Sequence, residues 1–352
     1  MVDLPPPVEP RRHHYVPRFL LKKFAEERRP GRFQIRTFDK ENGRAFFTNV
    51  ENVAVESDFN ALQLDGLRIS LEAGMGKIES DAAASINRIL ANGTLQGISL
   101  EDRAALDIFC ALQLLRGTAF RNQFAGLAAE MRNRIAAVAQ AENVEVAPEC
   151  GLELGDDDLK VAAFNIIVES LINFARTIGG KDLLLFKAAV GHPFLLGDNP
   201  IGMDNERQFG PYGNIGLAVP GIQIYLPISP EYSLAYWCPS ILQERREAVL
   251  VAERVIARAR MLMVVGNPAV ARQQPAFIAD ATQIRDSSSS SIERFEAGEA
   301  QPSTPDNVMR LNSVQIRTAE RWVMSRDGNF QLVERMIGDN ENFRRGHRFR
   351  FD

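Results

Sequence analysis

The chain has 352 residues, of which 45% are hydrophobic and 24% charged, and its formal net charge at pH 7 is −4. This length allows one large domain or two smaller ones, with a core that needs no disulfide bonds. The acidic balance gives no global attraction to nucleic acid phosphates, and no apolar run approaches the roughly 20 residues that span a bilayer.

The cysteines and the first residues of the chain indicate the cellular compartment in which the protein is expected. Cys110, Cys150 and Cys238 are odd in number and far apart, which matches neither a disulfide framework nor a paired-cysteine metal site. The chain begins without the basic and then apolar order of a secretory signal. We therefore expect a cytoplasmic protein with no membrane partner. Nucleic acid would be a partner only if local basic clusters, such as Arg344 and Arg345, met on one surface.

The first predicted elements are an arm and a hairpin. Residues 1–10 are rich in proline and acidic side chains, and we expect a flexible arm there. Residues 32–38 and 44–47 alternate between apolar and polar side chains as strands do. Asn42 and Gly43 lie between them and favour a hairpin turn.

A helical region follows. Residues 67–91 have apolar side chains at three- and four-residue spacing, which predicts an amphipathic helix. A long helix is predicted over 100–140, with Gly117 and Gly126 as positions where it can bend or be interrupted. Another is predicted over 159–177. Together these make 67–178 a candidate helical subdomain.

The second half of the chain mixes strand-like runs and helical segments. We expect short strands at residues 182–189, 193–196, 223–228 and 234–237. We expect helices over 241–265 and 308–324, with Arg245 and Arg246 on the solvent-facing side of the first. The serine-rich residues 282–305 predict a flexible loop, and 326–352 predict a polar, basic tail.

The order of strands, then helices, then a mixture is typical of an α+β protein and not of a regular βαβ array. The sequence thus predicts a single globular α+β domain over residues 11–325. It should contain small antiparallel sheet elements and several long helices.

The most distinctive stretch contains adjacent histidines followed by Tyr-Val-Pro, at residues 13–17. His14 is the first candidate site residue, because imidazole titrates near neutrality and is the commonest metal ligand in proteins. The alternative is a structural histidine held by a hydrogen bond.

Polar residues on the predicted helices are the next candidates. Glu79 lies at the edge of an apolar stripe and is either a site carboxylate or part of a solvated helix edge. Gln113 and Arg116 lie three residues apart on a face that should point inward, so both need partners. Arg116 is therefore either a clamp for a phosphate or carboxylate, or half of a structural ion pair with Glu79 or Asp198.

Asp198 and Asn199 follow an apolar run at the point where a strand should end. They either present polar groups to a site or close a turn with their own hydrogen bonds. Asn312 and Gln315 share one face of a predicted helix. They either line the same pocket or cap neighbouring backbone.

These positions together resemble the pattern of DUF4238, a family of mostly bacterial proteins of unknown function. The matching positions are His14-Tyr15-Val16-Pro17, Ile78-Glu79, Gln113, Arg116, Asp198-Asn199-Pro200, Asn312, Gln315 and Arg321. The resemblance runs from about residue 11 to residue 325 and implies one globular domain, but no established activity. Relatives often have serine before Asp-Asn-Pro, whereas this chain has Gly197.

Two functions of different classes fit these residues. The first is a metal-dependent phosphodiester hydrolase, such as a nuclease of a bacterial defence or toxin system. In this hypothesis His14, Glu79 and Asp198 hold Mg²⁺ or Mn²⁺, which suit oxygen ligands plus one imidazole, and Arg116 steadies the scissile phosphate.

The second function is a non-catalytic sensor or binding module. Here the same residues form a buried polar network around a small anionic ligand or a partner segment, and Gln113, Asn199, Asn312 and Gln315 contact that ligand. No P-loop, HExxH motif, paired-cysteine zinc motif or GxSxG elbow occurs in the sequence. The distances among His14, Glu79 and Asp198 and the partners of Arg116 discriminate between the two hypotheses.

Overall fold

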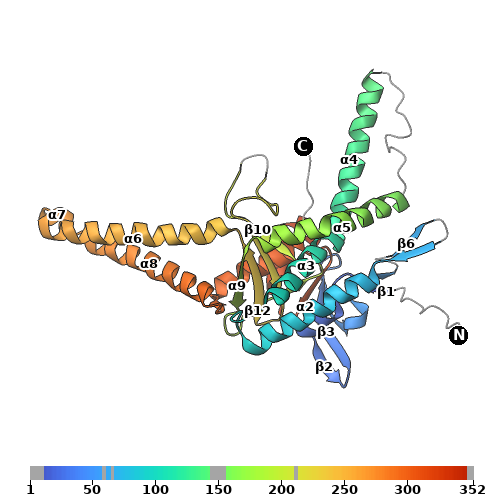
Figure 1. The fold of residues 1–352 in the computed structure, drawn as a ribbon, viewed down its shortest axis with the longest axis horizontal. Coiled ribbons are helices and arrows are strands. Elements are labelled where there is room, and N and C mark those ends of the chain that lie inside the picture. The colour runs from blue at the N-terminus through green and yellow to red at the C-terminus, as the bar shows by residue number, and fades with distance from the viewer. Residues whose placement is uncertain (1–11, 58–60, 65–66, 143–155, 210–212, 347–352) are drawn as a thin grey trace.

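The computed structural model describes residues 12–57, 61–64, 67–142, 156–209 and 213–346. Two larger sheets and a group of helices form the body, and two helical elements project from it (Figure 1). The α+β class predicted from the sequence is confirmed. The predicted arm over residues 1–10 lies outside the described residues.

The first sheet joins the beginning of the chain to its end. Its order is β2-β3-β14-β9, and β4 also pairs with β3. The strand bounds are β2 (Glu26–Arg29), β3 (Arg32–Asp39), β4 (Arg44–Asn49), β9 (Leu196–Gly197) and β14 (Trp322–Ser325). In β14, Val323 lies opposite both Phe38 of β3 and Gly197 of β9. The central strand therefore brings together segments that are far apart in sequence.

The predicted hairpin is confirmed. β3 and β4 pair antiparallel, with Asp39 opposite Arg44. Gly43 in the connecting turn has a φ of 64°, a conformation that glycine adopts without steric cost.

The second sheet has the order β10-β11-β12-β8-β13. Its strands are β8 (Asp182–Lys187), β10 (Gly202–Asp204), β11 (Gln223–Pro227), β12 (Tyr232–Trp237) and β13 (Gln301–Pro302). All pairs are antiparallel except β13 with β8. Side chains alternate between its faces, so Leu183 and Leu185 enter the main core while Leu184 and Phe186 pack on the opposite side.

Helices cover the main-core face of this sheet. They are α1 (Arg18–Phe24), α2 (Glu72–Asn92), α3 (Leu100–Arg116) and α5 (Asp156–Gly179). Ile86 of α2, Phe109 of α3 and Ile178 of α5 are buried in the same cluster as the inward side chains of β8, β11 and β12. This cluster forms the principal core.

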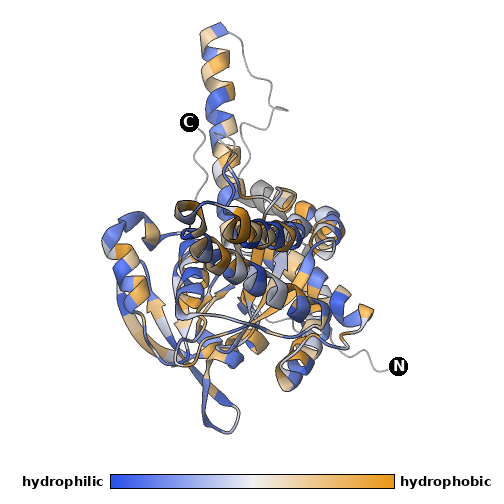
Figure 2. Ribbon diagram, turned by 90° about the vertical axis from the view of Figure 1, so that its left-hand side faces the viewer, coloured by the Kyte–Doolittle hydropathy of each residue, from blue (hydrophilic) through white to orange (hydrophobic). Residues whose placement is uncertain are grey.

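The two projections are α4 (Thr118–Glu142) and a helical hairpin (Figure 1). The hairpin consists of α6 (Pro239–Val265), the short α7 (Pro268–Ala271) and α8 (Gln274–Glu296). In Figure 2 the hairpin points toward the viewer. Ala252 and Ile256 of α6 pack against Ala281 of α8. The two alanine side chains allow the helices to approach closely.

The remaining elements are short, apart from α9. They are β1 (Arg12–His14), η1 (Val50–Asn52), β5 (Val55–Ser57), β6 (Ala61–Leu64), β7 (Leu67–Ser70), α9 (Pro305–Thr318), α10 (Gln331–Asp339) and η4 (Glu341–Arg344). β1 pairs with β5, and β6 pairs with β7. α9 lies over the second face of the second sheet, where Val308 and Leu311 are buried beside Leu184.

The assignments over 282–305 and 308–324 are wrong. The predicted loop over 282–305 is helical as far as Glu296, because α8 packs along α6 and buries Ala281 and Ser288. The helix predicted over 308–324 ends at Thr318, where Ala319 is extended and the chain enters β14. The long helix predicted over 100–140 is interrupted at Gly117, as the sequence indicated, because Gly117 is extended, whereas α4 continues through Gly126.

The predicted polar tail over 326–352 also needs correction. Within its described part, α10 packs Val333 and Ile337 into a second core cluster with Phe38 and Phe330. These residues therefore belong to the folded body. Among the helices that the structure describes, none is long and apolar enough to cross a bilayer.

Replacement of Ile337 by alanine tests the packing of α10. Ile337 is 5% exposed, so its truncation should lower the free energy of unfolding by about 2–5 kcal/mol. Gln331→Ala, at an exposed position of the same helix, should change it by less than about 0.5 kcal/mol. Denaturant titration measures both values, and equal effects would mean that this segment is a tail.

Candidate functional site

His14 is held by backbone groups of residues 50–55. β1 pairs antiparallel with β5, placing His14 opposite Val55. The ring nitrogen Nε2 lies 3.2 Å from the Val50 carbonyl oxygen, so this nitrogen carries the proton and donates it. Burial lowers the pKa of His14, and the nearby Arg18 and Arg12 lower it further, while the bond to Val50 opposes them. The structural alternative for His14 matches this environment.

Arg116 is buried, with 1% of its side chain exposed, and it is fully engaged. Its Nη1 lies 2.6 Å from Glu79 Oε1. With the Gln113 amide oriented so that its oxygen faces the guanidinium, that oxygen accepts from Nε at 2.9 Å and from Nη2 at 2.5 Å. The ion pair that the sequence offered as an alternative is present. Its donors leave little capacity for a phosphate, and loss of one partner would strand a buried charge.

Asp198 is a buried acceptor of backbone hydrogen bonds. Its Oδ1 accepts from Glu320 N at 2.7 Å, and its Oδ2 accepts from Arg321 N at 2.9 Å and Trp322 N at 3.0 Å. Burial raises the pKa of Asp198 to about 6, although these donors and Lys40 act in the opposite direction. Both carboxylate oxygens are therefore used in fixing the turn between α9 and β14.

Lys40 belongs to the same junction. Its Nζ donates to the carbonyl oxygens of Ile316 at 2.7 Å and Ala319 at 2.5 Å. Burial lowers the pKa of Lys40 to about 8, while Asp198 and Glu320 raise it. The ammonium group satisfies carbonyls at the end of α9, where the helix dipole favours positive charge.

Asn312 and Gln315 hold the segment that leads into Asp198. Asn312 accepts from Leu195 N at 2.8 Å and donates to the Pro193 carbonyl at 3.0 Å. Gln315 accepts from Gly197 N at 3.1 Å and donates to the Pro200 carbonyl at 3.0 Å. Both amides cap neighbouring backbone, as the second interpretation of the sequence proposed.

Asn199 and Gly197 complete this contact. Asn199 donates to the Thr318 carbonyl at 3.4 Å. A Cβ atom at Gly197 would lie 3.0 Å from the Gln315 carbonyl oxygen and 3.1 Å from Ala319 Cβ. Glycine therefore permits the close approach of β9 to α9 at a position where a larger side chain would displace backbone.

The predicted metal ligands do not form a group. Within the described ranges, no three His, Cys, Asp or Glu side chains are arranged to hold an ion. His14 contacts the Val50 carbonyl, Glu79 pairs with Arg116, and Asp198 accepts backbone N–H groups. The structure thus joins Glu79 with Arg116 and Gln113, and Asp198 with the α9 region, but it does not gather the proposed metal site.

A pocket on the other face of the second sheet contains residues that the sequence did not single out. It has a volume of about 260 Å³ and lies between the sheet, the first turns of α6, α9 and the segment after β10. Its apolar wall comprises Phe186, Tyr225 and Trp237. The Phe186 and Trp237 ring centroids are 5.5 Å apart.

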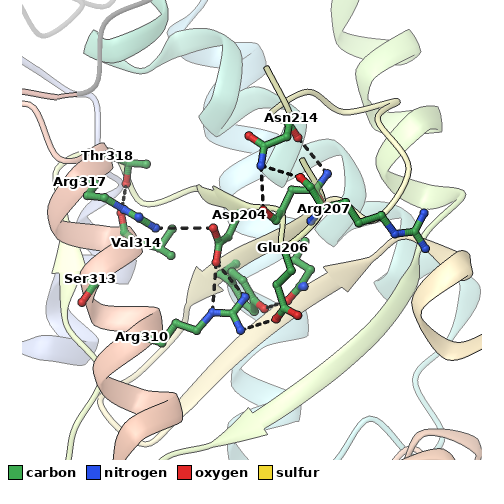
Figure 3. Close-up of polar contacts among 12 residues, drawn as sticks. Asp204, Glu206, Arg207, Asn214, Arg310, Ser313, Val314, Arg317 and Thr318 are labelled. Carbon is green, nitrogen blue, oxygen red and sulfur yellow. Dashed lines mark hydrogen bonds and ion pairs between the residues drawn. The ribbon is translucent and has the colours of Figure 1, made fainter. Parts of the chain in front are cut away.

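Two of the three arginines in this pocket are neutralised by carboxylates. Arg310 pairs with Glu206 and, at 2.9 Å, with Asp204, and Figure 3 shows this guanidinium between the two carboxylates. Arg207 pairs with Glu244 and donates to Ser240 Oγ at 3.2 Å.

Arg245 differs from these two. In the part of the chain that the structure describes it has no ion pair, and its buried Nε has no hydrogen-bond partner. The buried indole Nε1 of Trp237 makes no hydrogen bond of standard geometry there, although it interacts with the Tyr225 hydroxyl and acts to lower the pKa of that group. The guanidinium carbon lies 5.2 Å from the centroid of the Trp237 ring. Burial lowers the pKa of Arg245, yet a guanidinium stays protonated at any physiological pH.

The sequence contained only an indirect signal for this pocket. The periodicity of 241–265 placed Arg245 on the solvent-facing side together with Arg246. Pro239 begins α6 directly after the last residue pair of β12, so the first helical turn must lie close to the sheet. That proximity half-buries Arg245, whereas Arg246 is exposed and pairs with Glu296 at 3.1 Å.

The fold and these contacts define an α+β protein with a polar network that fixes the backbone and a separate small pocket that contains the unpaired donor Arg245 Nε. The chain belongs to the family described as protein of unknown function, DUF4238, whose model matches residues 12–329. Comparisons with curated proteins and with solved structures return no match. The matched range includes every element from β1 to β14.

Replacement of Asp198 by asparagine should change how stability depends on pH. A carboxyl pKa raised from 3.8 to about 6 stabilises the folded state below about pH 4, and this contribution is lost as pH rises through 6. The free energy of unfolding of the wild type, minus that of Asp198→Asn, should fall by an amount on the order of 3 kcal/mol over this range. Denaturant titrations at several pH values measure it.

The Asn199→Ala variant is the matched control for that series. Asn199 does not titrate and makes one long hydrogen bond, so its difference from the wild type should stay constant between pH 4 and 7. A flat profile for Asp198→Asn as well would show that the pKa of Asp198 is not raised.

Proposed function

We propose that this protein is a binding module for a small organic anion, which it holds in the pocket between the second sheet, α6 and α9. The observation that supports this proposal is Arg245, a half-buried cation whose Nε has no partner among the described residues and which lies beside the buried indole N–H of Trp237. Buried polar groups in proteins are normally paired, and a desolvated charge without a partner is costly. An anionic ligand would satisfy the Arg245 donor.

The pocket limits the ligand by size and by shape. A volume of about 260 Å³ lies just below the 300–1,000 Å³ of most ligand sites. Phe186, Tyr225 and Trp237 favour a flat apolar body over a highly hydrated ion. A single ring bearing one carboxylate or phosphate combines these properties.

The metal-dependent phosphodiester hydrolase, its Mg²⁺ or Mn²⁺ cofactor and a role in bacterial defence stay predictions. Nothing in the contacts of His14, Glu79 and Asp198 favours them, because each of these side chains already has a partner elsewhere. A cytoplasmic location and a nucleic acid partner likewise stay predictions. The alternative drawn from the sequence, a small anionic ligand, is the one we retain, at a different site.

Arg245→Gln tests the proposed role. Benzoate, a flat carboxylate of suitable size, should raise the melting temperature of the wild type, whereas the neutral and nearly isosteric benzamide should not. Loss of a hydrogen-bonded charge should weaken benzoate binding by roughly tenfold to a hundredfold. Isothermal titration calorimetry and thermal shift measure the effect.

The matched control is Arg246→Gln, which changes the same charge one residue away and should bind benzoate as the wild type does. Without ligand, Arg245→Gln should lower the free energy of unfolding by no more than about 1–2 kcal/mol, because the contact with the Trp237 ring is lost but no carboxylate loses an ion pair. A large drop in stability would indicate a structural role for Arg245. Equal benzoate binding by both variants, or none by the wild type, would contradict the proposal.

A further inference from the structure

The far end of the α6–α8 hairpin differs in composition from the rest of the molecule. We define the hairpin tip as residues 254–279, which comprise the end of α6, all of α7 and the start of α8. The tip contains Arg254, Arg258, Arg260 and Arg272, and no lysine, aspartate or glutamate. Its formal charge is therefore strongly positive in a chain whose net charge is −4.

These four arginines lack acidic partners. All four are exposed, and none of them forms an ion pair with a residue that the structure describes. Nearer the body, three arginines of the same hairpin are paired: Arg246 with Glu296, Arg285 with Asp286 and Arg294 with Glu299. The unpaired positive charge is thus concentrated at the tip.

The tip also exposes large aliphatic side chains. Val264 is 84% exposed, and Met261 and Val265 are each 65% exposed. Phe277 at the start of α8 is 51% exposed. Because these side chains are mostly exposed, they contribute little to packing within the hairpin, and an exposed group of large apolar residues is typical of an interaction surface.

The position of the tip makes both features accessible. α6 has 27 residues, which corresponds to a length of about 40 Å at the rise of an α-helix. The tip lies at the end of this projection, away from both sheets (Figure 1), and in Figure 2 it faces the viewer.

We propose that the hairpin tip binds the surface of a membrane that contains anionic phospholipids. In this arrangement Met261, Val264 and Val265 enter the boundary between headgroups and acyl chains, and the arginines contact lipid phosphates. Exposed aliphatic residues combined with unpaired basic residues are the features that bind peripheral proteins to such membranes. The absence of a spanning helix among the described residues concerns crossing a bilayer and not contact with its surface.

The combination of positive charge and exposed apolar side chains favours an anionic membrane over a second copy of the chain and over nucleic acid. A second copy would bring two strongly positive tips together, and like charges repel. Nucleic acid would attract the arginines, but its phosphates would gain nothing from Val264 and Val265. This proposal departs from the expectation, drawn from the sequence, that the protein has no membrane partner.

Vesicle flotation with the full-length protein tests the proposal. The wild type should float with vesicles of phosphatidylcholine and phosphatidylglycerol, but not with phosphatidylcholine alone, and added salt should weaken the binding. Two variants should each reduce the bound fraction at least tenfold. The first is a triple variant that combines Arg258→Gln, Arg260→Gln and Arg272→Gln. The second is a double variant that combines Val264→Ser and Val265→Ser. All substituted residues are exposed, so circular dichroism and melting temperature should stay unchanged.

The matched control replaces the three paired arginines, Arg246, Arg285 and Arg294, by glutamine. This variant loses the same charge from the same hairpin and should bind vesicles as the wild type does. Equal losses in the control and the tip variants would overturn the proposal, as would no flotation of the wild type. Flotation that the serine variant retains, together with duplex DNA binding lost in the glutamine variant, would assign the tip to nucleic acid.

Discussion

A buried carboxylate receives the backbone N–H groups of three consecutive residues, 320–322, at the point where α9 becomes β14. Asp198 lies directly after β9, and β14 pairs with β9 and β3, so this contact fixes the middle of the first sheet. The same turn orients α9, which covers the second sheet and forms one side of the pocket. Both sheets therefore depend on hydrogen bonds to a single side chain.

Six of the polar residues shared with the family pattern fall into two structural groups. Asp198, Asn312 and Gln315 satisfy backbone groups of segments that belong to no long strand or helix. Arg116, Glu79 and Gln113 satisfy one another between α2 and α3. Each group keeps buried donors and acceptors paired, which accounts for polar residues inside an apolar body without a catalytic role.

Local structure, such as the ends of helices, could be predicted from the sequence, whereas packing between distant elements could not. Gly93, with a φ of 66°, ends α2, and Ser99 Oγ accepts from Asp102 N at the start of α3, because helix caps depend on neighbouring residues. The Arg116–Glu79 pair was among the predicted alternatives because a buried guanidinium requires an acceptor. Arg245 was not among the predicted site residues, because the periodicity of its helix assigns it to the solvent-facing side. Only the position of the second sheet buries it. The serines of α8 led to the wrong prediction of a loop for the same reason. Packing against α6 stabilises this helix, and the helix propensity of serine does not.

One helix connects the two regions to which we assign binding. α6 places Arg245 near its beginning, at the sheet, and ends in the hairpin tip at Val265. The 20 residues between these positions correspond to about 30 Å of helix, so a tilt of roughly 10° at the pocket would displace the tip by ~5 Å. A small change in the angle of α6 at the pocket would therefore become a larger displacement of the hairpin tip.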